Sequence, residues 1–235
     1  MVPRLAMSSA LDCDRKRTFE RDGALLFENA LSDSVCMLEA LLAELPADAA
    51  GTRIHGLKGL NAFLRPSGSI GDVATHLLGG NARPVRTILF NKSAESNWSL
   101  GWHQDRTITV VERRDVAGFG PWTIKSGLHH VAPPFEILAN MVTLRAHLDD
   151  VPVTNAPLLV ALGSHRLGPV SEHRMNEVVR RSRVGTCLAK RGDIWAYSTP
   201  IVHASNAAAV PIARRVLQVD YAVGGLPGGL QWLGV

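Results

Sequence analysis

The sequence His103-Gln104-Asp105 lies near the middle of the chain, and His203 and Arg214 lie near its end. Residues two apart on an extended strand project from the same face, so one strand can present His103 and Asp105 together. An inward carboxylate is costly to bury without a cation. Two imidazoles and one carboxylate, with no thiolate close in sequence, suit a non-haem Fe(II) and leave coordination positions open. The pattern predicts a metal site in which His203 joins the pair from elsewhere in the fold.

Arg214 follows His203 by eleven residues and begins a segment in which every second residue from 217 to 221 is apolar. If these apolar residues pack on an outer layer, Arg214 faces inward together with Gln218. An inward arginine needs an anion, and a guanidinium offers two parallel donors that match a carboxylate. Arg214 is therefore expected to hold a dicarboxylate cosubstrate. Arg215 would take this role if the strand register shifts by one residue.

Each of these residues also has a plainer interpretation. His103 and Asp105 are consistent with a surface pair on an edge strand. Taken alone, His203 is typical of a hydrogen-bonded core histidine, and Arg214 of a surface arginine. The alternatives stay open at the level of local sequence.

Composition places the chain among ordinary globular proteins. It has 235 residues, 46% of them apolar and 20% charged, which suits one domain. Its apolar runs are too short to span a bilayer, so no membrane association is expected. Residues 1–15 do not form a convincing signal peptide. Three widely spaced cysteines suit reduced thiols, so we expect a cytoplasmic protein.

Basic residues are concentrated between Arg166 and Arg191, within a chain whose net charge is +4. This segment is either a solvated helix face or a contact site for an anionic partner, such as a phosphate-bearing or carrier-bound substrate. Nucleic acid is not expected as a partner, because the segment lacks interleaved aromatic residues and no nucleic-acid module is recognisable.

The chain changes character at Val85. Residues 1–84 are predicted to form a mainly helical layer, with a short strand at 23–27 and a helix from about 35 to 45. From residue 85 to 222, short apolar segments alternate with Gly, Pro, Asn and Asp, and residues 223–235 form a tail. The strands expected are 85–90, 98–111, 137–148, 158–162, 186–189, 193–197, 201–203 and 215–222. Many short strands without alternating helices indicate a barrel or sandwich. The long Gly- and Pro-rich segment 111–135 is predicted to be a functional lid loop.

These residues resemble the phytanoyl-CoA dioxygenase family of Fe(II)- and 2-oxoglutarate-dependent oxygenases, and in particular a bacterial subgroup of it. The resemblance covers nearly the whole chain. It rests on Phe19-Glu20-Arg21-Asp22-Gly23, Leu31-Ser32-Asp33, Leu89-Phe90-Asn91-Lys92, Trp102-His103-Gln104-Asp105, Gly163-Ser164-His165-Arg166, His203-Ala204-Ser205-Asn206 and Arg214. One departure is Asn155-Ala156-Pro157-Leu158, where the subgroup usually has glycine at the second position.

The resemblance implies a mainly β fold with flanking helices, a double-stranded β-helix of the jelly-roll, cupin-like type, spanning 1–235 as one domain. It implies these site roles: His103, Asp105 and His203 as catalytic iron ligands, Arg214 and Ser205 binding 2-oxoglutarate, and Asn91 and Lys92 lining the cosubstrate site. Arg106, Trp122, Lys125 and His130 are candidates for substrate contact.

By this resemblance, Fe(II), 2-oxoglutarate and O2 would hydroxylate a small organic or acyl substrate, with release of succinate and CO2. Asp105 favours oxygen transfer, because related halogenases replace this carboxylate with a small residue. Desaturation or ring formation would need only a different substrate pose. Two other functions stay open: a zinc-dependent cupin-like hydrolase, in which the metal activates water, and a non-catalytic 2-oxoglutarate-binding module.

Overall fold

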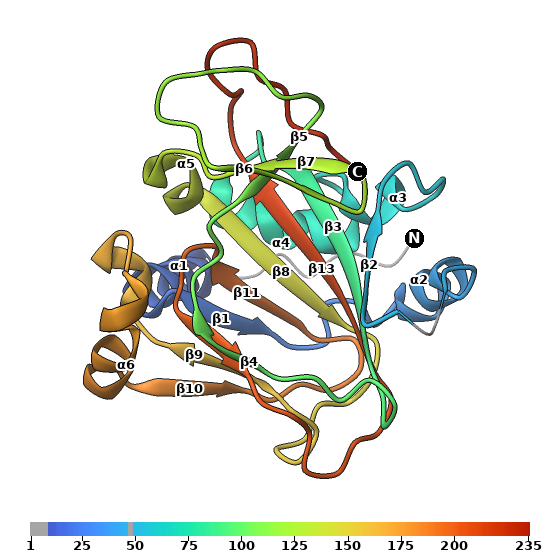
Figure 1. Ribbon diagram of the computed structural model, residues 1–235. Coiled ribbons are helices and arrows are strands. Elements are labelled where there is room, and N and C mark those ends of the chain that lie inside the picture. The colour runs from blue at the N-terminus through green and yellow to red at the C-terminus, as the bar shows by residue number, and fades with distance from the viewer. Residues whose placement is uncertain (1–8, 47–48) are drawn as a thin grey trace.

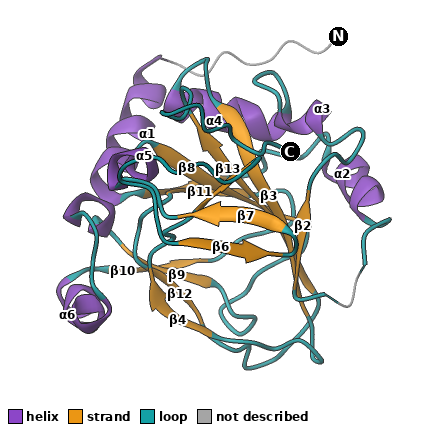
Figure 2. Cartoon of the chain, turned by 45° about the horizontal axis from the view of Figure 1, so that its top comes forward, coloured by secondary structure: helices purple, strands orange, loops and turns teal. Residues whose placement is uncertain are grey.

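The computed structural model describes residues 9–46 and 49–235. Residues 1–8 of the predicted helical layer, and residues 47–48, lie outside the described part. Two antiparallel sheets face each other, helices cover the outer face of the larger sheet, and a third small sheet lies across one end (Figures 1 and 2). The mainly β architecture with flanking helices, predicted from the sequence, is confirmed.

The major sheet has six antiparallel strands, which come from both the N-terminal and the C-terminal parts of the chain. In spatial order they are β1 (Ala24–Phe27), β11 (Ile194–Ser198), β8 (Met141–His147), β13 (Arg214–Ala222), β3 (Arg83–Lys92) and β2 (Gly51–Ile54). β13 pairs with β3 over its whole length and places Arg214 opposite Lys92. The long central strands therefore form a rigid platform on which inward side chains are held in fixed register.

The minor sheet has four strands: β10 (Val184–Cys187), β9 (Leu158–Ala161), β12 (His203–Ser205) and β4 (Leu100–His103). β12 lies between β9 and β4, and the pairing sets His203 directly opposite His103. Sequence positions a hundred residues apart thus become neighbours across one strand pair.

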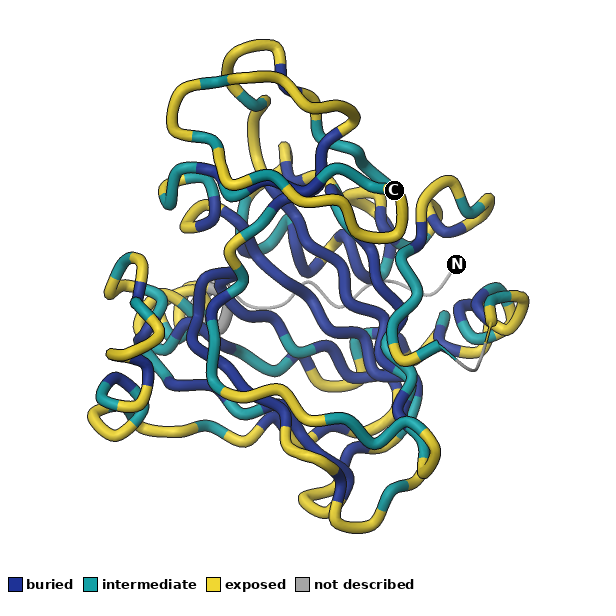
Figure 3. The backbone as a smooth tube through the Cα atoms, in the orientation of Figure 1, coloured by how far each residue is buried: buried dark blue, intermediate teal, exposed yellow. Residues whose placement is uncertain are grey.

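Alternation along the strands separates an apolar face from a polar one. On β13, Leu217, Val219 and Tyr221 are fully buried on the outward face, where they join the main hydrophobic core. That core is closed by helices from the N-terminal third of the chain: α1 (Ser9–Asp22), α2 (Val35–Leu42), α3 (Asn61–Leu64) and α4 (Ser69–Leu78). Figure 3 shows that the strands of the major sheet are buried along most of their length, while exposed residues gather in loops. Burying each such large apolar side chain contributes roughly 1.5–3 kcal/mol.

The segment predicted as a lid loop has more structure than expected. β6 (Trp122–Lys125) and β7 (Leu128–Val131) form a hairpin, and β7 also pairs with β5 (Ile108–Val110). Ser126 and Gly127 connect the two strands, both with positive φ. This is the backbone that a two-residue hairpin turn requires, and glycine favours it. The hairpin lies across the end of the jelly roll, and its own core contains Val110, Val131 and Leu230.

Three strand predictions were wrong in extent. Residues 98–111 form two strands in different sheets, because the chain leaves the minor sheet after His103. Residues 137–148 begin with the helix α5 (Phe135–Ala139), which Pro134 precedes, before β8 starts at Met141. The N-terminal third was expected to be helical with one strand, but it contributes a second strand, β2, to the edge of the major sheet. The remaining helical elements are η1 (Ser164–Leu167) and α6 (Glu172–Arg181), both on the outer side of the minor sheet. Within the described residues, every helix is too short or too polar to cross a bilayer.

Candidate metal centre

His103, Asp105 and His203 meet at one point between the two main sheets. One ligand atom from each lies within 4.8 Å of the other two, and the two imidazole centroids are 4.2 Å apart. His103 ends β4 and His203 begins β12, so the strand pairing itself brings the imidazoles together. The expectation that one strand presents both His103 and Asp105 was wrong in detail, because Asp105 lies just beyond the strand. The three groups still converge.

Backbone hydrogen bonds fix the orientation of both imidazoles. His103 Nδ1 donates to the carbonyl oxygen of Gly101 at 2.8 Å, and His203 Nδ1 donates to that of Ile201 at 2.9 Å. A carbonyl oxygen only accepts, so each Nδ1 must carry the proton. Each Nε2 then keeps its lone pair for a metal, which is the usual arrangement of histidine ligands. Burial lowers the pKa of His203, which keeps the ligand form neutral.

Asp105 is held near Arg86, a residue that the sequence analysis did not single out. Arg86 Nη2 lies 3.9 Å from Asp105 Oδ2, and Arg86 Nε donates to the carboxylate of Asp220. Burial alone would raise the pKa of Asp105, but the positive charge of Arg86, with smaller contributions from both imidazoles, holds that pKa below its ordinary value. The carboxylate is therefore ionised, as a metal ligand must be.

Gln104, between the two ligands, points away from the centre and anchors it. Its Nε2 donates to the carbonyl oxygens of Pro200, at 2.8 Å, and Gly168, at 3.1 Å. Its Oε1 accepts from the backbone N–H of Val170 at 2.8 Å. One buried side chain thus ties the ligand segment to the turn before β12 and to the loop before α6. This role of Gln104 was not predicted from the sequence.

Arg214 points inward and Arg215 points outward. Arg214 is 2% exposed, and its Nη1 donates to the carbonyl oxygen of Ala156. Arg215 forms ion pairs with Asp149, at 2.7 Å, and Glu39, at 3.2 Å, on the far side of the sheet. The inward register predicted for Arg214 is therefore the one observed, and a shift by one residue does not occur.

Several buried polar atoms around Arg214 have no hydrogen-bond partner among the described residues. They are Arg214 Nε, Arg145 Nε, Ser205 Oγ, Asn155 Nδ2 and both ring nitrogens of His147. Burial, and then Arg145, lower the pKa of Arg214 to about 9. Buried polar groups are normally satisfied, so this donor-rich cluster fits an anion with several acceptor oxygens.

Lys92 extends the same donor-rich region from the neighbouring strand. It is buried opposite Arg214, its Nζ donates to the carbonyl oxygen of Asn206 at 2.8 Å, and it lies 4.5 Å from the Trp98 ring centroid. Burial, followed by Arg214 and Arg145, lowers its pKa to about 8. Asn91, predicted to line the same site, is opposite Arg215, on the strand positions that face away from it. The structure brings Lys92 and Ser205 near Arg214 but not Asn91.

A cavity of about 180 Å³ adjoins the three ligands and is lined by residues of both main sheets. Lys125 of the hairpin lines it, as do two residues that the sequence analysis missed, Arg53 and Arg145. The other three substrate candidates are placed elsewhere. Arg106 donates to the carbonyl oxygen of Val170 and lines a second pocket, which shares Asp105 with the first, while Trp122 and His130 belong to the hairpin.

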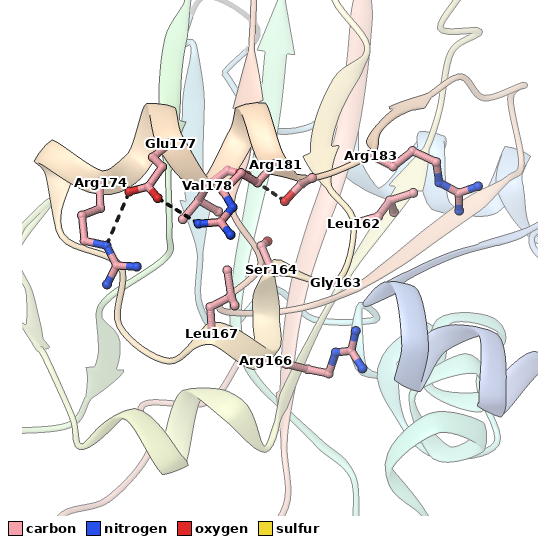
Figure 4. A pocket seen from close by; sticks show the side chains of 11 residues that line it. Leu162, Gly163, Ser164, Arg166, Leu167, Arg174, Glu177, Val178, Arg181 and Arg183 are labelled. Atoms are coloured by element: carbon pink, nitrogen blue, oxygen red, sulfur yellow. Dashed lines mark hydrogen bonds and ion pairs between the residues drawn. The ribbon is translucent and has the colours of Figure 1, made fainter.

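The basic segment 166–191 lies on the outside of the minor sheet, away from this cavity. α6 and η1 enclose a pocket of about 440 Å³ that four arginines line (Figure 4). Arg174 and Arg181 share Glu177, and Arg183 lies 3.4 Å from Asp22. Much of the positive charge of this segment is therefore already compensated.

Comparison with known proteins agrees with the ligand geometry. The family model of phytanoyl-CoA dioxygenase matches residues 19–216, from α1 to β13. The chain belongs to the phytanoyl-CoA dioxygenase family. This is a family of 2-oxoglutarate-dependent non-haem iron oxygenases that use Fe(II) and O2. Among curated protein sequences, none matches this member.

Solved structures share the fold at low sequence identity. EctD from S. alaskensis in its apo form superposes with a TM-score of 0.65 at 20% identity, covering 95% of this family member and 79% of EctD. SnoK, a non-haem α-ketoglutarate-dependent carbocyclase from nogalamycin biosynthesis, gives a TM-score of 0.67 at 16% identity, covering 98% and 88%. HygX from Streptomyces hygroscopicus, solved with nickel and 2-oxoglutarate, gives 0.62 at 14% identity, covering 89% and 86%. The jelly-roll fold expected from the resemblance is confirmed.

Proposed function

We propose that this protein is a dioxygenase that hydroxylates a small organic or acyl substrate while 2-oxoglutarate is converted to succinate and CO2. The observation that carries the proposal is the convergence of His103, Asp105 and His203 within 4.8 Å, with both imidazoles oriented by backbone carbonyls. Two neutral imidazoles and one carboxylate are the donor set that non-haem Fe(II) oxygenases use.

Arg214, Ser205 and Lys92 are proposed to hold 2-oxoglutarate. Arg214 is buried and has no acidic partner in the part of the chain that the structure describes, so its guanidinium can supply the paired donors that a carboxylate accepts. Ser205 lies two residues after His203 on β12, and its unpartnered hydroxyl adds a further donor. Arg145 and His147 on β8, which the sequence analysis did not assign, contribute unpartnered nitrogens to the same region. The fit is chemical: the orphaned atoms are donors for a small, oxygen-rich anion.

Bound iron would supply the activation of O2, with one oxygen atom entering succinate as CO2 leaves and the other entering a substrate C–H bond. The residues of the chain position and shield the reactants. Gln104 holds the ligand segment, Arg86 keeps Asp105 ionised, and Phe90, Ile88 and Leu158 give the cavity apolar walls. Such a site orients the reacting groups and excludes bulk water, which are the tasks the protein performs for a metal cofactor.

The test is the metal-dependent conversion of 2-oxoglutarate. Purified protein with Fe(II), O2 and 2-oxoglutarate is expected to form succinate, even slowly without a prime substrate, and Zn(II) is expected to inhibit. His103→Ala and Asp105→Ala should abolish this turnover while circular dichroism shows a retained fold. Unchanged turnover in either variant would remove the metal assignment. Zinc-dependent hydrolysis without succinate would favour the hydrolase, and 2-oxoglutarate binding without any turnover would favour a binding module.

Two further predictions from the sequence remain proposals. The basic segment 166–191 is proposed as a contact for an anionic or carrier-bound substrate, supported by Arg166, which forms no ion pair with the described residues, at the pocket in Figure 4. A cytoplasmic location is proposed because Cys13, Cys36 and Cys187 are free thiols, which is typical of reducing compartments.

A further inference from the structure

The cavity beside the three metal ligands has a strong excess of positive charge. Four of the residues that line it are basic, Arg53, Arg86, Lys125 and Arg145, and only Asp105 is acidic. Asp105 is a proposed metal ligand, and Arg86 forms ion pairs with Asp105 and with Asp220. No lining residue therefore offers a free carboxylate to a cationic substrate, while several offer a positive charge to an anion.

Arg53 is a basic lining residue of this cavity whose hydrogen-bond donors are largely unsatisfied within the described residues. It is half-buried on β2, and its Nη1 donates only to the hydroxyl of Ser126, at 3.3 Å. Its Nε is buried without a hydrogen-bond partner, and within the described residues it forms no ion pair. Burial, and then the nearby charge of Arg86, lower the pKa of Arg53. A buried guanidinium with a free donor edge is suited to bind an oxyanion.

Lys125, on the hairpin of β6 and β7, lines the same cavity. It ends β6, and the turn Ser126-Gly127 next to it touches Arg53, so the tip of the hairpin lies beside β2 (Figure 2). The pKa of His130 in the same hairpin is lowered by burial and, among other charges, by Arg86, Arg53 and Lys125. Lys125 is exposed and Arg53 is half-buried, so the two residues line the cavity where it meets solvent, here called its mouth, from two different sheets.

This pair is distinct from the donors proposed for 2-oxoglutarate. Arg214 is opposite Lys92, at one end of β3, whereas Arg53 is opposite Ile88. Four residues of strand separate these two positions along β3, roughly 13 Å at the usual rise per residue. A five-carbon dicarboxylate held by Arg214 with its 2-oxo end at the metal does not extend to the mouth as well. Arg53 and Lys125 therefore need a different anion.

We propose that the prime substrate is a small oxyanion, most simply a carboxylic acid, whose anionic group binds between Arg53 and Lys125 while its reacting C–H bond points toward the metal. The inference rests on the proposed function, because it uses the same cavity. A cavity of about 180 Å³ limits the part of the substrate that enters to a few carbon atoms. A phosphate monoester presents the same chemistry and differs by its higher charge.

The test uses protein loaded with Ni(II) and 2-oxoglutarate, which occupies the Arg214 end and prevents turnover. Calorimetric titration compares butanoate, hexanoate and benzoate with their neutral primary amides, and benzoate with phenyl phosphate. The variant Arg53→Gln/Lys125→Gln removes the proposed anion site. The matched control Lys16→Gln/Arg65→Gln removes the same charge from exposed positions on the helical side of the molecule.

At least one carboxylate is expected to bind about tenfold or more tightly than its amide, the value of a charge-assisted hydrogen bond. This preference should vanish in the Arg53 and Lys125 variant and persist in the control. Lys125→Gln alone, on an exposed strand end, should reduce the preference without risk to the fold. Tighter binding of phenyl phosphate than of benzoate would identify a phosphate ester as the source of the anion.

Equal binding of acids and amides, binding of no anion at all, or a preference that survives in the double variant would overturn the inference. Succinate formation by the iron-loaded wild type decides the proposed function separately. A protein that forms succinate but shows no preference for acids over amides would refute only the anionic substrate.

Discussion

Replacing Arg214 by alanine is expected to weaken the binding of 2-oxoglutarate by about tenfold to 150-fold. Arg214 is 2% exposed and has no acidic partner among the described residues, so its charge is fully available to a carboxylate. Losing one charge-assisted contact of this kind removes about 1.5–3 kcal/mol, which gives the range above. The affinity is measured by calorimetric titration of 2-oxoglutarate into the Ni(II)-loaded protein, which binds without turnover.

Arg215 provides the matched control, one residue along the same strand. Its side chain is 37% exposed and pairs with Asp149 and Glu39 on the outer face. Surface ion pairs contribute up to about 1 kcal/mol, so Arg215→Ala should slightly lower the free energy of unfolding and leave 2-oxoglutarate affinity unchanged. If Arg215→Ala weakens 2-oxoglutarate binding and Arg214→Ala does not, the reasoning from strand register is refuted.

Three further changes test other parts of the site. Gln104→Ala should lower the free energy of unfolding by about 2 kcal/mol, measured by urea denaturation, because it leaves the N–H of Val170 and two carbonyl groups without their hydrogen-bond partner. Ala156→Gly should raise that free energy by up to about 1 kcal/mol, because Ala156 has a φ of 51°, in the left-handed region where an L side chain is strained and glycine is not. Burial lowers the pKa of His147 from 6.5 to about 3, so the protein should be less stable in mild acid. Below pH 6.5 the unfolded imidazole binds a proton that the folded one does not, so the loss is about 2 kcal/mol by pH 5.

Each of these expectations has a clear contrary result. If the free energy of unfolding of Gln104→Ala lies within about 0.5 kcal/mol of the wild-type value, the hydrogen bonds of Gln104 are not needed for stability. A less stable Ala156→Gly would mean that the turn is not strained by its side chain. For His147, urea curves at pH 5 and 7 are compared between the wild type and His147→Gln. An equal pH dependence in both proteins would assign the acid sensitivity to other groups.

The sequence predicted the inward positions best where the strand alternation was long and regular. Residues 217–221 of β13 alternate apolar and polar, so the inward direction of Arg214 followed from the outward positions of Leu217 and Val219. The same signal was present on β8, where Arg145 and His147 alternate with Leu144 and Ala146, but the basic residues were not assigned. Both lie on the face that carries Gln218, to which Arg145 donates.

Other parts of the site had no local signal. Gln104 acts through backbone groups of Pro200 and Val170, which are distant in sequence, so only the folded structure identifies its role. Arg53 lies on a four-residue edge strand whose neighbours are not strongly apolar, and its closeness to Lys125 depends on where the hairpin lands. Helix α5 was predicted as strand, because short apolar runs do not distinguish the two periods.

The outward face of the major sheet stabilises the fold, whereas its inward face buries positive charge at a cost in stability. Its outward face buries Leu217, Val219 and Tyr221 against the helices and supplies stability. Its inward face buries Arg214 and holds Arg145 close enough for burial, and then the charge of Arg145, to lower the pKa of Arg214. Neutral groups accept their hydrogen bonds, among them Gln218 for Arg145 and the carbonyl oxygen of Ala156 for Arg214. Buried cations without anions are unfavourable, so the apolar outer face must offset them in the free protein. Any anion that binds only the folded state relieves this repulsion and adds its own binding energy to stability. The donors that are proposed to bind 2-oxoglutarate are thus the ones that the rest of the sheet has to stabilise.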